Sequence, residues 1–157
     1  MSPRRHPKSP RNSRGVAAVE LGLLITPLLV MMLGATEFGR AIYTYNNLDK
    51  AVRDAARHLS QHGPGDTGIQ AQARCMAVYV SGCSGSLIAP ELTEGNVILR
   101  DALSAPGTHA AQATGSGVVN LVSVTIVGYR FRSAVAFDVI PATIDFNNIS
   151  VTMRAQL

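Results

Sequence analysis

The sequence predicts an α+β protein in which one long N-terminal helix crosses a membrane and continues into a small domain with a second helix and a short antiparallel sheet. Three observations predict this fold. Residues 16–36 hold a single charged side chain, residues 38–59 keep the spacing of one helix face, and two β-branched stretches near the C-terminus alternate apolar with polar side chains. With roughly 45 residues in the long helix, the chain of 157 residues leaves about 90 for one domain.

The first 15 residues form a basic leader. They contain five of the 14 Lys and Arg residues and no acid, so the remainder of the chain carries nine positive and ten negative residues. Three prolines and the lack of a large apolar side chain after Met1 predict a disordered segment. Because Lys and Arg are enriched on the cytoplasmic side of membrane segments, we expect a cytoplasmic N-terminus and place the chain after Thr36 outside. No nucleic-acid partner is expected, since the leader has no aromatic side chain to stack on a base.

Residues 16–36 are apolar except for Glu20. At about 1.5 Å per residue, these 21 residues form a helix of roughly 31 Å, close to the ~30 Å thickness of a hydrocarbon core. A carboxylate inside the bilayer costs at least ~2.5 kcal/mol unless it is neutralised. Two explanations remain open. Glu20 reaches the headgroups from one turn inside the run, or cleavage after Gly15 exposes an amino group at Val16 with which Glu20 of the same or a neighbouring chain pairs.

Pro27 lies in the middle of this apolar run, where it removes one backbone donor. A kink is predicted at this point. The carbonyl that Pro27 leaves free needs another donor in lipid, and Thr26 or a neighbouring helix is expected to supply it.

A secretory signal peptide is the competing interpretation of the same N-terminus. A basic segment, an apolar segment and the small-residue site at residues 33–35 fit its pattern, and cleavage there would release a soluble protein beginning near Thr36. Against it, the apolar run exceeds the usual ~7–15 residues, contains Glu20, and is followed by further helical spacing.

Residues 15–61 carry a family resemblance; their sequence is GVAAVELGLLITPLLVMMLGATEFGRAIYTYNNLDKAVRDAARHLSQ. They resemble the N-terminus of the TadE-like pseudopilins of the tight-adherence (Tad/Flp) pilus and secretion machinery. They are also similar to the type IV pilin pattern of a basic leader, a Gly, and a Glu at the fifth residue after the cut. The resemblance implies a pilin-like fold, cleavage between Gly15 and Val16 by a prepilin peptidase, and Glu20 as the carboxylate used in assembly. Leu21 departs from the aromatic residue that Flp-type pilins have at this position.

The helix is predicted to continue beyond the membrane, so that one helix covers residues 16–61. Apolar side chains recur in its outer part at steps of three or four residues, which places them on one face. These residues are Phe38, Ile42, Tyr45, Leu48, Val52, Ala55 and Leu59. Two pairs of opposite charge at four-residue spacing each add a few tenths of a kcal/mol; they are Asp49 with Arg53 and Lys50 with Asp54. Residues 62–65, with the sequence HGPG, end the helix.

The remaining residues, 63–157, are predicted to form one small α+β domain. Asp66 is expected to cap a second helix over residues 67–80. Cys75 and Cys83 are the only cysteines, and their spacing fits neither a CxxC redox motif nor a zinc site. In an oxidising periplasm we expect a disulfide between them worth about 2–3 kcal/mol, the alternative being two free thiols.

Two strands near the C-terminus are predicted to pair and to cover the helix. Residues 84–117 are rich in Gly, Ser, Ala, Pro and Thr and are expected to form a loop with at most one short strand, at residues 96–100. Residues 118–127 and 149–154 alternate apolar and polar side chains. Their apolar face is expected to lie on the helix face that includes Val52.

The sequence contains no catalytic or cofactor-binding pattern. His58 and His62 lie four residues apart and could share a metal ion, but two ligands rarely suffice and no HExxH motif is present. All four histidines, which also include His6 and His109, are therefore expected to be exposed and without a function. We expect that this protein is not an enzyme and that it binds neither a metal, a cofactor nor a small-molecule substrate.

The resemblance and the residue patterns together imply a structural subunit of the pilus or secretion machinery. It is expected to be a single-pass protein of a bacterial inner membrane, and three places after assembly remain open: in the extracellular pilus fibre, at its tip or in the assembly platform. Its expected segments are a leader (1–15), a membrane helix (16–36), a periplasmic extension of that helix (37–62) and a periplasmic domain (63–157). Its expected partners are the membrane, other pilus or pseudopilin subunits, the assembly platform and the prepilin peptidase. The alternatives are an uncut bitopic envelope protein with a periplasmic binding domain, and the secreted protein described above.

Overall fold

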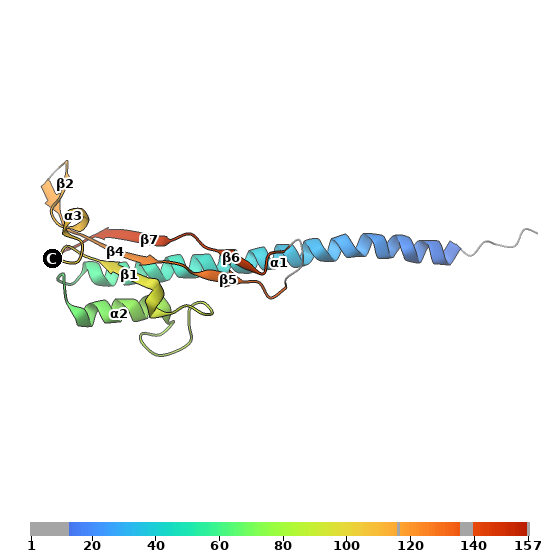
Figure 1. The fold of residues 1–157 in the computed structure, drawn as a ribbon, viewed down its shortest axis with the longest axis horizontal. Helices are drawn as coiled ribbons and strands as arrows, with labels where there is room; N and C mark the ends of the chain where they lie inside the picture. Colours follow the sequence, from blue (N-terminus) through green and yellow to red (C-terminus); the bar gives the residue numbers. More distant parts are fainter. Residues whose placement is uncertain (1–12, 116, 136–139, 157) are drawn as a thin grey trace, which may run out of the picture. The chain divides into compact units, whose positions relative to one another are not determined.

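The structure, a computed structural model, describes three stretches of the chain: residues 13–115, 117–135 and 140–156. The chain divides into two compact units, Met1–Thr36 and Glu37–Leu157. A long N-terminal helix, a second helix and small antiparallel sheets make it an α+β protein, as predicted (Figure 1).

Helix α1 (Ser13–Ser60) is the long helix predicted over residues 16–61, with small shifts at both ends. In the first unit its apolar side chains are exposed; Leu24, for example, is 71% exposed and Met31 74%. Its most apolar part has a mean hydropathy of 2.3, and the helix is long and apolar enough to cross a membrane.

Thr26 does not bond the carbonyl that Pro27 leaves free. That carbonyl belongs to Leu23, four residues before Pro27. The Thr26 hydroxyl instead donates to the Gly22 carbonyl oxygen at 2.9 Å. A threonine in a helix reaches the carbonyl four residues before itself, so this part of the prediction is wrong. The kink at Pro27 stays a prediction.

A three-stranded antiparallel sheet packs on α1 in the second unit. In sheet order, its strands are β1 (Val97–Arg100), β4 (Leu121–Ile126) and β7 (Ile149–Arg154). Val124, in the central strand, lies opposite Leu99 on one side and Val151 on the other. The pairing of the two strands predicted from alternation is therefore confirmed.

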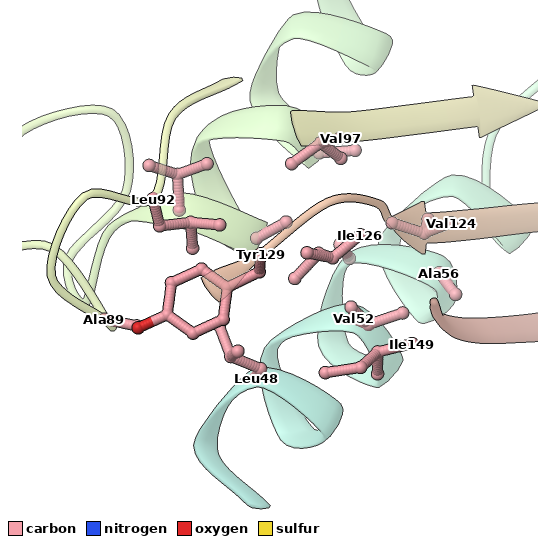
Figure 2. Packing of buried hydrophobic residues seen from close by; sticks show 14 of the residues in the cluster. Leu48, Val52, Ala56, Ala89, Leu92, Val97, Val124, Ile126, Tyr129 and Ile149 are labelled. Atoms are coloured by element: carbon pink, nitrogen blue, oxygen red, sulfur yellow. The ribbon is translucent and has the colours of Figure 1, made fainter. Parts of the chain in front are cut away.

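The hydrophobic core lies between this sheet and α1. Figure 2 shows Ile126 and Ile149 of the sheet near Val52 of α1, and Tyr129 near Leu48. Leu48 and Val52 have no exposed surface, and Ile126 retains only 1%. The predicted contact between the apolar face of the strands and this helix face is confirmed.

The buried face of α1 differs from the prediction at the start of the second unit. Phe38, Ile42 and Tyr45, predicted to face the core, are 64%, 46% and 43% exposed. The buried residues here are Glu37 and Ala41, each one position earlier and each 5% exposed. The chain segment that bonds to Glu37 covers α1 at this point and so determines which face is buried. Apolar spacing did not predict this face, because spacing alone does not distinguish two neighbouring faces of a helix.

Helix α2 (Thr67–Val78) begins at the predicted cap. The Asp66 carboxylate accepts hydrogen bonds from the backbone N–H groups of Gly68 at 2.9 Å and Ile69 at 3.1 Å. Gly65 precedes the cap with a φ of 83°, a conformation that glycine adopts without strain.

Helix α2 ends two residues earlier than predicted. Tyr79 is extended and forms an isolated β-bridge with Leu87, which leaves Val80 66% exposed. Cys75 in α2 and Cys83 in the following loop form the predicted disulfide. A disulfide that closes so short a loop contributes about 2–3 kcal/mol, so it holds this loop against the helix.

The structure contains further short elements that were not predicted. These are η1 (Glu94–Asn96), α3 (Pro106–His109), the hairpin of β2 (Gln112–Thr114) with β3 (Gly117–Val119), and the hairpin of β5 (Arg130–Arg132) with β6 (Thr143–Asp145). The strand predicted over residues 118–127 is interrupted at Asn120, whose side-chain oxygen accepts a hydrogen bond from the Ala111 N–H at 2.9 Å. β3 and β4 consequently belong to different sheets.

Asp101 joins three parts of the second unit. Its carboxylate is 5% exposed and accepts hydrogen bonds from the Gly65 N–H at 2.9 Å and the Gln70 side-chain amide at 3.0 Å. It also accepts from the N–H groups of Leu103 at 3.1 Å and Ser104 at 2.7 Å. Burial alone raises the pKa of Asp101, but these hydrogen bonds outweigh it and lower the pKa to about 2. Asp101 therefore stays charged and fixes the turn before α2, α2 itself and the segment after β1.

Candidate functional site

The peptide bond between Gly15 and Val16 lies in the first turn of α1, which begins at Ser13. Val16 is 60% exposed. A peptidase must take this bond out of the helix before cutting it, and the first turn is the easiest to open because its N–H groups have no partner within the helix. The position is therefore compatible with cleavage, and the cut itself stays a prediction.

Glu20 lies one helical turn after Val16 on the same side of α1. The Cα–Cβ bonds of an α-helix tilt toward its N-terminus, so the Glu20 side chain leaves the helix on the side of Val16. Glu20 is exposed and forms no ion pair with any residue whose side chain the structure describes. A cut after Gly15 would create a new ammonium group one helical turn before this carboxylate.

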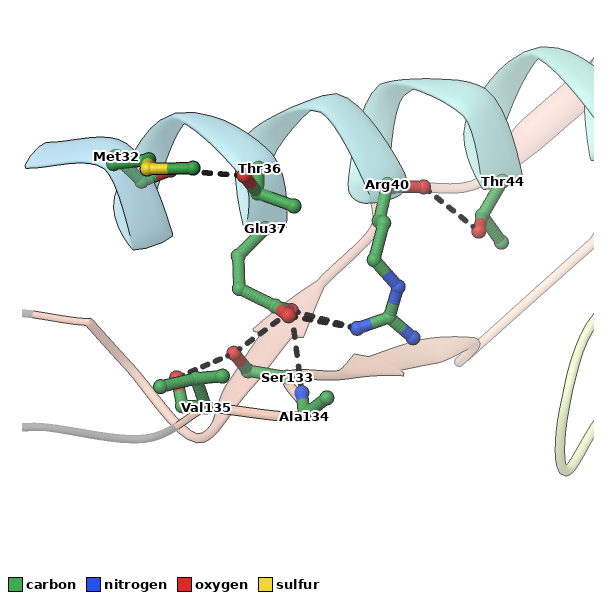
Figure 3. Close-up of polar contacts among 8 residues, drawn as sticks. All are labelled: Met32, Thr36, Glu37, Arg40, Thr44, Ser133, Ala134 and Val135. Carbon is green, nitrogen blue, oxygen red and sulfur yellow. Dashed lines mark hydrogen bonds and ion pairs between the residues drawn. The ribbon is translucent and has the colours of Figure 1, made fainter. Parts of the chain in front are cut away.

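A second carboxylate, Glu37, occurs where the apolar run of α1 ends, and it is 5% exposed. Arg40 Nη1 donates to its two oxygens at 2.8 and 2.9 Å, and the Ala134 N–H donates at 3.2 Å. The Ser133 hydroxyl lies 3.0 Å from Glu37 and 2.8 Å from the Val135 carbonyl, and its single proton serves both acceptors. Figure 3 shows these groups converging on Glu37 from α1 and from the segment after β5.

The Glu37 carboxylate is held in its charged form. Burial raises the pKa of Glu37, but the hydrogen bonds from Arg40, Ser133 and Ala134 together outweigh burial and lower the pKa below its ordinary value. The carboxylate therefore keeps its charge at neutral pH while it is shielded from solvent. Sequence reasoning missed this site. An acid followed by Arg three residues later could have indicated the ion pair, but no local signal indicates partners that lie 96 and 97 residues further along the chain.

An open groove of about 340 Å³ lies between α1, α2 and the segment after the disulfide loop. Its lining combines aromatic and apolar side chains with a few polar ones: Tyr43, Asn47, Lys50, Ala51, Asp54, Met76, Tyr79, Val80 and Ile88. The predicted pair of Asp49 with Arg53 is formed at 2.8 Å, whereas Lys50 and Asp54 form no ion pair with each other. Both of these charged groups line the groove.

The histidines differ from the prediction. His109 is 7% exposed, with Nε2 2.8 Å from the Ser123 hydroxyl and Nδ1 2.7 Å from the Thr108 hydroxyl, so it joins α3 to β4. His58 and His62 are half-buried, with ring centroids 4.7 Å apart. The expectation of exposed histidines is wrong for these three because packing of the second unit covers them. His6 lies outside the described residues.

No group of three or more His, Cys, Asp or Glu side chains within residues 13–115, 117–135 and 140–156 is placed to hold a metal ion. The His109 and Ser123 pair is buried, and neither residue lines the groove. The carboxylates that stand out in the described part of the chain are thus Glu20 and Glu37 at the two ends of the apolar run, and Asp101 within the second unit.

A family model described as TadE-like protein matches residues 15–57. The matched segment begins at Gly15, includes Val16 and Glu20, and ends within α1. Comparison with curated proteins and with solved structures gave no match. The resemblance drawn from the sequence is confirmed over this segment. Residues 15–57 of the chain are therefore similar to the TadE-like family.

Proposed function

We propose that this chain is a pseudopilin-like structural subunit of a tight-adherence (Tad/Flp) pilus or secretion machinery. Residues 16–36 anchor it in the bacterial inner membrane, the second unit lies in the periplasm, and a prepilin peptidase cuts the chain after Gly15. The observation that carries the proposal is the TadE-like match, because it begins at Gly15 and continues through the apolar part of α1. The partners are then the membrane, other pilus subunits, the assembly platform and the peptidase.

The chemistry of Glu20 gives the proposal a physical mechanism. A lone carboxylate or a lone ammonium in the bilayer costs at least ~2.5 kcal/mol. When the cut exposes the Val16 ammonium, the two groups form a neutral pair, within one chain or between neighbouring chains. The pair then leaves the lipid together when the subunit is drawn into an assembly.

The N-terminal residue of the protein recovered from cells tests the proposal. We expect Edman degradation or mass spectrometry of the native protein to give Val16 as the first residue. Met1 or Ser2 would show that the leader is retained and would contradict processing. Thr36 or a nearby residue would show secretion by a signal peptide and would contradict membrane anchoring.

Replacing Glu20 by glutamine is expected to reduce co-isolation of the subunit with pilus components more than tenfold, while the N-terminus remains Val16. The reason is that Glu20→Gln removes the carboxylate with which the Val16 ammonium of a neighbouring chain pairs in the assembly, and an ammonium left unpaired in apolar surroundings costs at least ~2.5 kcal/mol. The measurement is pull-down from membranes followed by quantitative mass spectrometry. Glu94→Gln, which removes an exposed carboxylate in η1, is the matched control and should not change co-isolation. Equal recovery of both variants would contradict the pairing of Glu20 with Val16.

The alternative function, an uncut bitopic envelope protein with a periplasmic binding domain, is favoured by one observation. The groove of about 340 Å³ between α1 and α2 has the mixed apolar and polar lining of a surface that takes a peptide or a small ligand. Retention of Met1 or Ser2 at the N-terminus, together with binding of a peptide or small ligand in the groove that Tyr43→Ala abolishes, would support this function over the first.

A further inference from the structure

The surface of α1 stays apolar beyond the predicted membrane helix. Phe38 is 64% exposed, Ile42 46% and Tyr43 69%, and all three follow closely after Thr36, where the apolar run ends. At about 100° per residue, Phe38 and Tyr43 point in directions that differ by roughly 140°. A partner helix would cover a stripe about 100° wide. The wider spread of these side chains is typical of a surrounding medium such as lipid.

The charges of this part of α1 are neutralised. Between Thr36 and Asp49 the only charged residues are Glu37 and Arg40, which form an ion pair at 2.8 Å. Glu37 is shielded from solvent, as described above. The Arg40 side chain is half-exposed, and its guanidinium carbon lies 5.6 Å from the centre of the Phe131 ring. These two turns of α1 therefore expose apolar and aromatic surface and one arginine, a combination typical of residues at the edge of a bilayer.

The length of this surface matches the headgroup layer. From Thr36 to Ile42 the helix rises roughly 9 Å at about 1.5 Å per residue. A bilayer of about 40–45 Å with a hydrocarbon core of about 30 Å has a headgroup layer of roughly 5–8 Å on each side. A helix tilt of about 20° brings the two lengths closer together.

We propose that the lipid headgroup layer covers α1 from Glu37 to Tyr43, so that Phe38, Ile42 and Tyr43 contact lipid. This inference rests on the proposed anchoring of residues 16–36 in the membrane. It explains why Phe38 and Ile42, which continue the apolar spacing, do not face the protein core. The ion pair of Glu37 with Arg40 then allows a carboxylate to lie beside lipid without an unpaired charge.

The protein offers a clean spectroscopic test because it contains no tryptophan. Four single-tryptophan variants of the full chain are made: Phe38→Trp, Ile42→Trp, Leu28→Trp within the proposed membrane helix, and Arg57→Trp at an exposed site near the end of α1. Each is reconstituted in vesicles of phosphatidylethanolamine and phosphatidylglycerol. Fluorescence is quenched by lipids brominated near the headgroup, by lipids brominated deep in the chains, or by aqueous iodide.

We expect lipids brominated near the headgroup to quench the tryptophan emission of Phe38→Trp and Ile42→Trp most strongly. Lipids brominated deep in the chains should quench Leu28→Trp most strongly, and aqueous iodide should quench Arg57→Trp most strongly. If iodide quenches Phe38→Trp as strongly as Arg57→Trp while Leu28→Trp responds to deep bromine, the anchoring holds and the inference is wrong. If neither lipid nor iodide quenches Phe38→Trp, protein covers this surface, as in a contact with a second copy, and the inference is also wrong. If lipid does not quench Leu28→Trp, the proposed anchoring itself fails.

Discussion

Replacing Leu48 by alanine is expected to lower the free energy of unfolding of the second unit by about 2–5 kcal/mol. Leu48 has no exposed surface and lies in the cluster that joins α1 to the sheet, near Tyr129 (Figure 2). Truncation removes buried methyl groups and leaves a cavity, since the sheet and the helix are tied together by many other contacts and close only in part. Chemical denaturation of the full chain in detergent micelles, followed by circular dichroism, measures the loss.

Leu103→Ala is the matched control for this prediction. Leu103 is the same residue type but is 67% exposed, so its truncation should change the free energy of unfolding by less than about 1 kcal/mol. Similar losses for the two variants would contradict the position of the core between α1 and the sheet. A loss confined to Leu48→Ala would show that α1 is part of the folded domain and not only its membrane anchor.

Replacing Asp101 by asparagine is expected to lower the free energy of unfolding by about 2–3 kcal/mol at neutral pH. The Asp101 carboxylate accepts four hydrogen bonds from groups in three segments. An asparagine amide has only one acceptor oxygen, and its NH2 group would face N–H donors that then have no acceptor. Denaturation with urea at pH 7 measures this loss. Asp145→Asn is the control, because Asp145 is exposed and pairs at the surface with the exposed Arg130; it should cost less than about 1 kcal/mol.

The same carboxylate predicts a pH dependence. The pKa of Asp101 is about 2 in the folded protein, below its ordinary value of 3.8. Its contribution to stability is therefore complete above about pH 4 and is lost as the pH falls toward 2, by about 2 kcal/mol. The wild-type protein should lose this amount between pH 5 and pH 2 in addition to whatever Asp101→Asn loses. Parallel stability curves for the two proteins over this range would contradict the role assigned to Asp101.

Those parts of the fold that depend on neighbouring residues could be predicted from the sequence. The apolar run of α1, its end near residue 61 and the Asp66 cap each rest on a few adjacent side chains. The pairing of β4 with β7 followed from alternation, because an apolar face needs a partner. The disulfide of Cys75 with Cys83 followed from the absence of any other use for two cysteines.

The parts decided by distant contacts could not be predicted. Which face of α1 is buried near Glu37 depends on Ser133 and Ala134, and apolar spacing is the same whether or not that segment covers the helix. The break in the predicted strand at Asn120 depends on its bond to Ala111, and the hairpins β2–β3 and β5–β6 are too short to show alternation. In the candidate site, Gly15, Val16 and Glu20 form one continuous pattern, so they could be proposed from sequence alone. Glu37 could not.

The disulfide has a practical consequence for work with this protein. Tyr79, Val80 and Ile88, which flank the loop held by Cys83, also form one wall of the groove. A sample produced in the reducing cytosol of an expression host lacks the covalent link, because glutathione and thioredoxin keep the thiols reduced. Ligand screens and binding assays on such a sample would test a groove in which the disulfide does not hold this wall in place. Export of the recombinant chain, or oxidative refolding verified by thiol titration, is therefore the condition for interpreting them.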